Sequence, residues 1–233
     1  SHAWYADWIR RKHAYAVDSE SLFLDEDRFC AIAAGTGLPP LYQTSVFPFH
    51  TVAEGAARFL GHSPSGEKPF ARIYTRLGNP TTEYLEKVIF RLEAQHLIDR
   101  ALGADEATPS VGALVFSSGM AAISTVIMAL VRTGDTIVAG NVYGCTDSLL
   151  RGLQRRFGVD VIWTDTTDPR RVQADLARAH RPAALLVETP DNPTLRVSDL
   201  RALSAIAETF QVPMVVDNTF ATPFLQQPFR LGA

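Results

Sequence analysis

Short apolar runs alternate with longer amphipathic segments along the chain from residue 113 onward. The runs show no alternation of polar and apolar positions, which is typical of strands that are buried on both faces. Predicted strands cover residues 113–116, 136–139, 159–163, 183–187 and 213–216. Predicted helices lie between them, at residues 120–131, 147–157, 170–179 and 199–210. This order indicates an α/β fold, with a mostly parallel sheet and helices on both faces.

One more helix is predicted ahead of this alternation. Asn79 is a good N-cap and Pro80 suits the first helical position. Apolar residues then recur at helical spacing until about Gly103. Residues 1–72 carry clusters of glycine and proline and are predicted to form an N-terminal arm and loops. Residues 73–233 are therefore expected to form the large domain.

Composition narrows the class of protein. The chain has 233 residues, of which 46% are hydrophobic and 20% charged, as is usual for a soluble globular protein. Its net charge is −3, whereas a nucleic-acid-binding protein typically carries an excess of basic residues. The uncharged stretch at 107–131 is interrupted by Pro109 and Gly119, so it is predicted to be a buried strand and helix rather than a membrane span.

Cysteine and histidine usage points to a reduced compartment and no metal. The two cysteines, Cys30 and Cys145, are too few for a disulfide framework. No charged region followed by an apolar run opens the chain, as a secretion signal would require, so a cytoplasmic location is expected. The six histidines are scattered without the spacing of metal ligands, and no metal site is predicted.

Candidate binding residues follow four of the predicted strands, at the sheet edge where open α/β folds bind ligands. They are Ser117-Ser118-Gly119-Met120, Tyr143-Gly144-Cys145, the run from Glu188 to Asn192, and Asp217-Asn218-Thr219. These groups are small, aromatic or acidic. The sequence therefore predicts that they meet at one ligand.

Each group also has an ordinary structural role as an alternative. The turn at Ser118 offers free N–H groups to a phosphate at a helix N-terminus, but Ser-Ser-Gly is more often an ordinary strand-to-helix turn. Tyr143 suits either stacking on a flat ligand or covering the sheet edge. Asp217 needs a cation or a donor, which is either an ion-pair partner or a protonated ring nitrogen. Glu188 and Asn192 lie in a proline-rich loop, where either residue is also a turn former.

Tyr74 and Arg76 precede the Asn79 helix. An arginine fork beside a phenol is suited to phosphate oxygens, and a solvated surface pair is the alternative.

Five runs, in this order, resemble the Cys/Met-metabolism family of pyridoxal-phosphate (PLP) enzymes of fold type I. The similarity covers about residues 36–233. The runs are Tyr74-Thr75-Arg76-Leu77-Gly78-Asn79-Pro80-Thr81, Ser118-Gly119-Met120-Ala121-Ala122, Val142-Tyr143-Gly144-Cys145-Thr146, Glu188-Thr189-Pro190-Asp191-Asn192-Pro193-Thr194-Leu195 and Val216-Asp217-Asn218-Thr219-Phe220-Ala221-Thr222-Pro223. Residues 73–233 would then be the PLP-binding large domain, without the family's C-terminal domain.

The resemblance implies roles around the cofactor. The amides of Gly119 and Met120, beside Ser118, would hold the phosphate, and Tyr74 and Arg76 would reach it from a neighbouring subunit. This cross-subunit contact implies a homodimer as the minimal active unit, usually paired into a homotetramer.

The remaining implied roles concern the pyridine ring. Tyr143 would stack on the ring and assist proton transfer, and Asp217 would keep the ring nitrogen protonated, which makes the ring an electron sink. Asn192 would contact the ring hydroxyl, Glu188 would lie nearby and Thr219 would line the site.

One element of the family pattern is missing. The family forms its Schiff base through a lysine in a Ser-x-x-Lys run that would fall beyond residue 233. The three lysines of this chain, Lys12, Lys68 and Lys87, match nothing there. The chain is therefore expected to be a fragment of a longer enzyme. The N-terminal start and the loop at 105–112 also look unusual for the family.

The family resemblance implies γ-elimination or γ-replacement on a sulfur- or homoserine-derived amino acid. Cys145 after Tyr143-Gly144 resembles methionine γ-lyases and favours elimination, with a small buried residue after a turn as the alternative. γ-Replacement, as in cystathionine γ-synthase, O-acylhomoserine sulfhydrylase or a specialised biosynthetic relative, stays open. A non-catalytic scaffold with this fold is the alternative from a different class.

Overall fold

The computed structural model describes residues 41–49, 51–59, 73–103 and 111–233. Residues 1–40, 50 and 60–72 of the predicted N-terminal arm and loops (1–72), and most of the predicted loop at 105–112, lie outside the described residues. The chain divides into two compact units, one of residues 1–91 and 107–115 and the other of residues 92–106 and 116–233. The expected domain boundary after residue 72 stays a prediction.

The described part of the first unit contains helix α3 (Val52–Phe59) and the first turns of helix α4 (Pro80–Gly103). The sequence predicted α4 but not α3. Asn79 begins α4 as expected, because its Oδ1 accepts a hydrogen bond of 2.9 Å from the Thr81 N–H. An isolated antiparallel bridge pairs Val46 with Tyr74.

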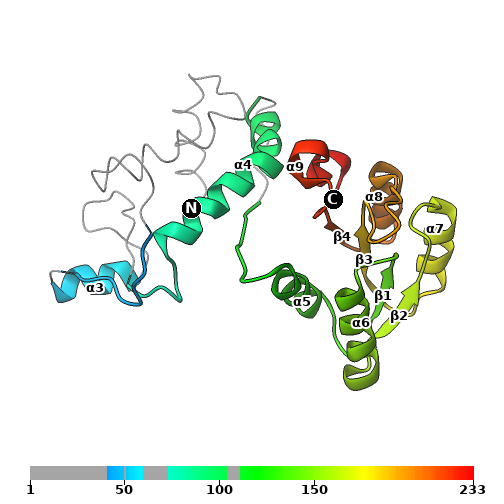
Figure 1. Ribbon diagram of the computed structural model, residues 1–233, viewed down its shortest axis with the longest axis horizontal. Helices are drawn as coiled ribbons and strands as arrows, with labels where there is room; N and C mark the ends of the chain where they lie inside the picture. Colours follow the sequence, from blue (N-terminus) through cyan, green and yellow to red (C-terminus); the bar gives the residue numbers. More distant parts are fainter. Residues whose placement is uncertain (1–40, 50, 60–72, 104–110) are drawn as a thin grey trace. The chain divides into compact units, whose positions relative to one another are not determined.

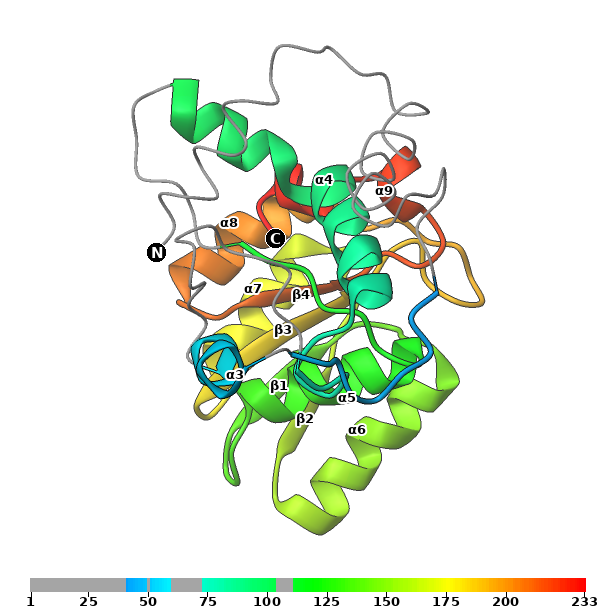
Figure 2. The ribbon, with the colours of Figure 1, turned by 90° about the vertical axis from the view of Figure 1, so that its left-hand side faces the viewer.

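The second unit is built on four parallel strands. They are β1 (Thr136–Ala139), β2 (Asp160–Trp163), β3 (Pro182–Glu188) and β4 (Met214–Asp217). Their order across the sheet is β2-β1-β3-β4, which can be followed in Figure 2. These strands confirm the predicted parallel sheet, and β1 has the predicted bounds.

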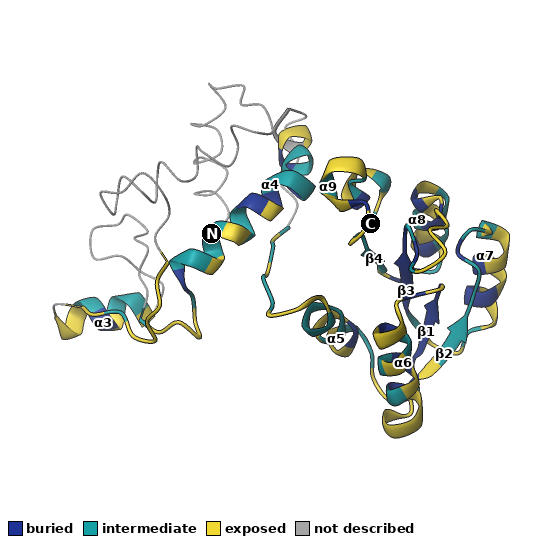
Figure 3. Ribbon diagram, in the orientation of Figure 1, coloured by how far each residue is buried: buried dark blue, intermediate teal, exposed yellow. Residues whose placement is uncertain are grey.

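Helices cover both faces of this sheet, as predicted (Figure 1). Helices α5 (Gly119–Leu130) and α6 (Gly144–Phe157) pack on the face that carries Ile137 and Ala139 of β1. Helices α7 (Pro169–Arg178) and α8 (Leu200–Thr209) pack on the face that carries Val138. Alternate side chains of β1 thus enter two separate cores. All four residues of this strand are therefore buried (Figure 3).

Residues 113–116, predicted as a strand, are not a strand in the structure. Strands require a hydrogen-bonded neighbour, and the Val115 N–H donates instead to Glu86 Oε1 at 3.0 Å. Leu114 is 77% exposed, so this run is not buried on both faces either. An apolar run alone could not reveal that its backbone has a side chain as partner.

Two short helices follow β4, α9 (Thr222–Leu225) and the 3₁₀ helix η1 (Pro228–Leu231). Among the described residues, no helix combines the length and the apolar character that crossing a membrane requires.

The sheet topology determines where a ligand can bind. From β1 the chain crosses to β2 on one side, and β3 lies against β1 on the other side. The order of strands reverses between β1 and β3, and α/β sheets bind ligands beyond the carboxyl ends at such a point. A ligand site is therefore expected at this edge of the sheet.

Candidate active site

A cavity of about 330 Å³ lies beyond the carboxyl ends of β3 and β4, against the first turn of α5. Its volume is in the range of small-molecule sites. Eight residues singled out from the sequence line it: Ser118, Gly119, Met120, Tyr143, Glu188, Asn192, Asp217 and Thr219. Segments far apart in the chain therefore converge at one cavity. Tyr143, Glu188 and Asp217 lie at or just beyond strand ends, whereas the strand predicted before Ser118 is not a strand in the structure.

The N-terminus of α5 forms one wall of the cavity. Ser118 is the N-cap, and its Oγ accepts a hydrogen bond of 3.1 Å from the Ala121 N–H. The N–H groups of Gly119 and Met120 come earlier in the first turn, where a helix supplies no acceptor. A Cβ on Gly119 would meet no atom within 4 Å, so space for a ligand remains beside these amides. With the helix dipole, these two N–H groups are suited to an anion.

Glu188 holds two loops together at the floor of the site. Its Oε2 accepts the Tyr143 N–H at 2.6 Å, and its Oε1 accepts the Asn192 N–H at 2.8 Å. The residue is only 6% exposed. Burial and the charges of Asp217 and Asp191 raise the pKa of Glu188, although the two backbone hydrogen bonds act in the opposite direction. Glu188 thus fixes where Tyr143 and Asn192 lie.

Tyr143 stands at the start of α6 and is 44% exposed. A hydrogen bond with the nearby Cys145 thiol, together with the charge of that thiol when ionised, raises the pKa of the Tyr143 phenol. Cys145 itself is an exposed free cysteine in the first turn of α6 and is not one of the residues that line the cavity. Its predicted contact with a substrate stays a prediction.

Asp217 ends β4 inside the cavity. Its Oδ1 accepts hydrogen bonds from Thr219, at 3.1 Å from the backbone N–H and 2.5 Å from the hydroxyl. Its Oδ2 takes no hydrogen bond from the described residues, so this carboxylate retains an acceptor for a ligand. The next residue, Asn218, is hydrogen-bonded to Gln226, whose Nε2 also donates to the Thr189 carbonyl at 3.0 Å.

Tyr74 and Arg76 belong to the first unit. The guanidinium carbon of Arg76 lies 5.0 Å from the centroid of the Tyr74 ring, within the range of a cation–π contact. The predicted contact of this pair with a phosphate across a subunit interface stays a prediction.

Three lining residues escaped the sequence argument: Ile123, Pro190 and Phe220. The candidate residues were chosen mostly among polar groups and glycines, whereas small-molecule cavities are walled largely by apolar groups. A signal was present for Ile123, which lies one helical turn beyond Gly119 and so faces the same side of α5. Pro190 and Phe220 are each in a run that also contains a predicted residue.

Comparison with known proteins identifies the class to which this arrangement belongs. Residues 26–233 match the family model described as Cys/Met metabolism PLP-dependent enzyme. The chain therefore belongs to this family, as its five motifs predicted.

Individual relatives agree with this assignment. An L-methionine gamma-lyase from Fusobacterium nucleatum is 39% identical over 200 residues, which cover 85% of this chain and 45% of the relative. An O-succinylhomoserine sulfhydrylase from Pseudomonas aeruginosa is 36% identical over 196 residues, which cover 83% of this chain and 42% of the relative. The chain thus spans less than half the length of these two relatives.

A solved structure matches as well. The cystathionine gamma synthase from Xanthomonas oryzae, in complex with cystathionine, has a TM-score of 0.71 and 30% sequence identity. The match covers 94% of this chain and 49% of that one. The fold is that of the fold type I PLP enzymes, which confirms the predicted fold class.

The family's cofactor is pyridoxal 5'-phosphate. It combines a phosphate, an aromatic ring and a basic ring nitrogen, and the cavity offers a partner for each. The amides at the start of α5 suit the phosphate, the Tyr143 side chain suits the ring, and the Asp217 carboxylate has a free acceptor for a protonated nitrogen. The residues present therefore fit the group.

Proposed function

We propose that this chain contributes the cofactor-binding region of a PLP-dependent enzyme that catalyses γ-elimination or γ-replacement on a sulfur- or homoserine-derived amino acid. The observation that supports the proposal is a single cavity that joins a helix N-terminus, the Tyr143 side chain and the Asp217 carboxylate. Neither the Tyr143 side chain nor the Asp217 carboxylate is required by the fold alone, and function must be argued from such a site.

In the proposed complex, the N–H groups of Gly119 and Met120 bind the cofactor phosphate, and Ser118 caps the same helix. Tyr143 lies against the ring, and Asn192 contacts the ring hydroxyl. Asp217 holds a proton on the ring nitrogen, with Thr219 fixing the orientation of the carboxylate through two hydrogen bonds. When bound, the cofactor supplies an electron sink for charge that develops on the substrate.

Tyr143 is the residue of this chain best suited to move a proton. A tyrosine phenol carries its proton at neutral pH, and the pKa of Tyr143 is raised further in the same direction. The side chain is partly exposed and lines the cavity, so its Oη is accessible to a substrate. Glu188 holds the Tyr143 backbone and so restricts where the ring can lie.

Elimination of the methionine γ-lyase type is the preferred reaction. The relatives include several L-methionine gamma-lyases at 34–40% identity, and Cys145 beside Tyr143 favours the same choice. γ-Replacement is the second candidate, because an O-succinylhomoserine sulfhydrylase and a cystathionine gamma synthase are also relatives. A specialised biosynthetic reaction of the same type belongs to this second candidate.

The proposal includes an assembly and a location. Tyr74 and Arg76 serve the cofactor of a neighbouring subunit, so the active unit is a homodimer, which pairs into a homotetramer. The scarcity of cysteines fits a reducing compartment, and the cytoplasm is the proposed location.

A full-length protein that contains this chain and the Ser-x-x-Lys run, purified and incubated with PLP, tests the two reactions against each other. Elimination from L-methionine consumes water and releases methanethiol, ammonia and 2-oxobutyrate without any added nucleophile. Replacement on O-succinylhomoserine releases succinate only when a thiol such as cysteine is supplied. Absence of both products, together with no binding of the cofactor, would favour the non-catalytic scaffold.

A further inference from the structure

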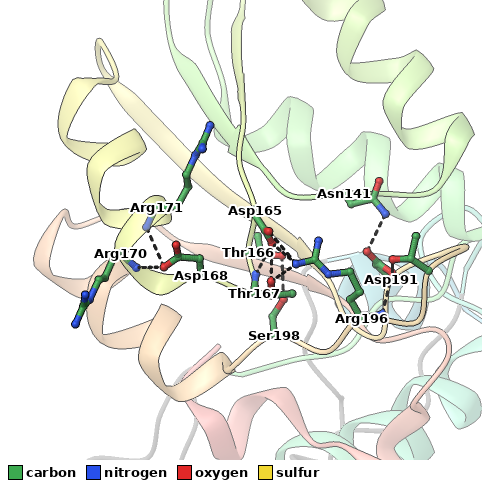
Figure 4. A network of polar contacts seen from close by, with 11 residues as sticks. Asn141, Asp165, Thr166, Thr167, Asp168, Arg170, Arg171, Asp191, Arg196 and Ser198 are labelled. Atoms are coloured by element: carbon green, nitrogen blue, oxygen red, sulfur yellow. Dashed lines mark hydrogen bonds and ion pairs between the residues drawn. The ribbon is translucent and has the colours of Figure 1, made fainter.

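A second carboxylate, Asp191, lies behind the cavity and holds the same two loops as Glu188. It is 5% exposed. Its Oδ2 accepts a hydrogen bond of 2.8 Å from Asn141 Nδ2, and its Oδ1 accepts the Arg196 N–H at 3.0 Å (Figure 4). The Thr194 hydroxyl also donates to Oδ1. Neither Asn141 nor Asp191 lines the main cavity.

These contacts close a ring around the edge of the site. Asn141 lies two residues before Tyr143, and Asp191 immediately precedes Asn192. Tyr143 and Asn192 are joined through the Glu188 carboxylate, while Asn141 and Asp191 are joined directly. Two loops connected at two points cannot rotate about either contact. The ring therefore fixes the separation of Tyr143 and Asn192, both of which line the cavity.

The ring is anchored to the sheet through Arg196. Its Nη2 contacts both oxygens of Asp165, at 3.0 and 2.8 Å, just beyond the end of β2 (Figure 4). Ser198 Oγ donates to Thr166 Oγ1 at 2.9 Å, which ties the next part of the same loop to the same strand end. These groups surround a second, smaller polar cavity of about 130 Å³. The loop that carries Asn192 is thus held from behind.

Asp191 is suited to this task because it remains charged. Burial alone would raise the pKa of Asp191, but the hydrogen bonds from Thr194, Asn141 and Arg196, together with the Arg196 charge, lower it below its usual value. Hydrogen bonds to a charged acceptor are stronger than those to a neutral one. Glu188, on the cavity side, has its pKa shifted in the opposite direction.

We propose that Asp191 is a positioning residue of this site: through Asn141 and the 191–196 turn, it sets the separation of Tyr143 and Asn192 across the cofactor cavity. The inference rests on the proposed function for the identity of the ligand. The geometry that it assigns to the protein does not depend on that identity.

Exchanging the two partners provides the test. Asn141→Asp places two carboxylates face to face, so the contact breaks. The double variant, Asn141→Asp with Asp191→Asn, restores it with the roles reversed. The new amide at position 191 would keep its oxygen for Thr194 and Arg196 and would offer its NH₂ group to the new carboxylate at position 141. Loss in the single variant and recovery in the double variant therefore report the contact itself.

Two readouts are measured in each variant. The first is hydrogen exchange at the Tyr143 and Asn192 amides, which donate to Glu188 in the intact ring. The second is the affinity for pyridoxamine 5'-phosphate, which carries the cofactor's ring and phosphate but forms no imine with a lysine. We expect Asn141→Asp to speed exchange and weaken affinity by about tenfold each, and the double variant to restore both to within about threefold of the wild type.

Asp135→Ala is the matched control. Asp135 is also a buried carboxylate, held by the Arg132 N–H and the Arg181 side chain, but it precedes β1 at the opposite edge of the sheet. The substitution should lower the free energy of unfolding. The hydrogen exchange rates of the Tyr143 and Asn192 amides should stay unchanged relative to those of other amides.

The proposal is overturned if Asn141→Asp leaves the exchange rates of the Tyr143 and Asn192 amides unchanged, or if the double variant does not restore these rates. It is also overturned if Asp135→Ala speeds exchange at the two amides by the same factor. If the wild type does not bind pyridoxamine 5'-phosphate but exchange follows the expected pattern, the proposed function fails and the positioning role stands.

Discussion

Glu188 and Asp217 are partners in the register between β3 and β4, so neighbouring strands end in two carboxylates at one cavity. Their surroundings differ. Glu188 is buried, and both of its oxygens accept backbone N–H groups from loops, whereas Asp217 keeps Oδ2 free of hydrogen bonds from the described residues. Two carboxylates in unequal environments take unequal roles. Glu188 organises the protein, and Asp217 is available to the ligand.

Asp217→Ala is expected to keep part of the cofactor affinity but to lose activity, on the order of 100-fold or more, because the phosphate contacts remain while the ring nitrogen loses its partner. The nitrogen-15 chemical shift of labelled pyridoxamine 5'-phosphate reports whether that nitrogen is protonated. The wild type should show the protonated value and Asp217→Ala the unprotonated one. Full activity in the variant would remove the proposed role of Asp217.

Gly140→Ala should destabilise the protein by about 1–3 kcal/mol. Gly140 follows β1, and a Cβ there would lie 2.6 Å from Thr166 Cγ2. Urea unfolding measures the change. Gly152→Ala is the control, since a Cβ at Gly152, inside α6, would meet nothing within 4 Å and should stabilise the helix by about 0.5–1 kcal/mol. Equal effects of the two substitutions would contradict the close approach at Gly140.

Acid sensitivity should depend on the Asp165–Arg196 pair. Hydrogen bonds from Arg196 and Thr167 lower the pKa of Asp165 from 3.8 to about 2. Because this pKa is depressed in the folded state, the stabilisation is present above 3.8 and is lost as the pH falls towards 2. Asp165 is partly exposed, so solvent screening reduces the size of the effect.

The measurement is urea unfolding from about pH 5 to about pH 2 for the wild type, Asp165→Asn, Arg196→Ala and the double variant. The difference in the free energy of unfolding between the wild type and Asp165→Asn should shrink as the pH falls across this window. The effects of Asp165→Asn and Arg196→Ala on this free energy should not be additive. A difference that stays constant with pH would show that the pair does not titrate as described.

Arg76→Ala should weaken cofactor retention in the partner subunit's site. Mixed dimers with Tyr143→Phe test this placement, because a dimer with one variant of each kind would keep one intact site. Mixing the two inactive variants in equal amounts should recover about a quarter of the wild-type activity. If no activity returns, Arg76 serves its own subunit's site or none.

Sequence patterns predicted the sheet well because β1, β3 and β4 are mostly apolar, without alternation, and several of the helices between the strands have side-chain caps. Asp168 and Asp199, for example, cap α7 and α8 through their side chains. Helix α3 was missed because it lacks a buried apolar stripe. Its one buried residue is Gly55, which lies next to the Phe49 ring. The strand at 113–116 was wrongly predicted because hydropathy carries no information about the hydrogen-bond partner of Val115.

Those residues of the candidate site that lie at or just beyond the end of a strand could be predicted from the sequence. Tyr143, Glu188 and Asp217 were found in this way and converge on the cavity. Ser118 lines the same cavity, although the strand predicted before it is not a strand in the structure. The second carboxylate at Asp191 was not found, because an acidic residue before Asn-Pro is also an ordinary turn former. Only the three-dimensional structure brings it within 2.8 Å of Asn141, 50 positions earlier in the chain.

The most direct test of the proposed cofactor site is a titration of the protein with pyridoxamine 5'-phosphate, followed by the backbone amide resonances of Gly119 and Met120. If the start of α5 binds the phosphate, these two amides should move downfield and saturate, and inorganic phosphate should shift the same pair more weakly. Unchanged Gly119 and Met120 resonances at saturating ligand, or shifts confined to residues outside the cavity, would contradict the proposed site.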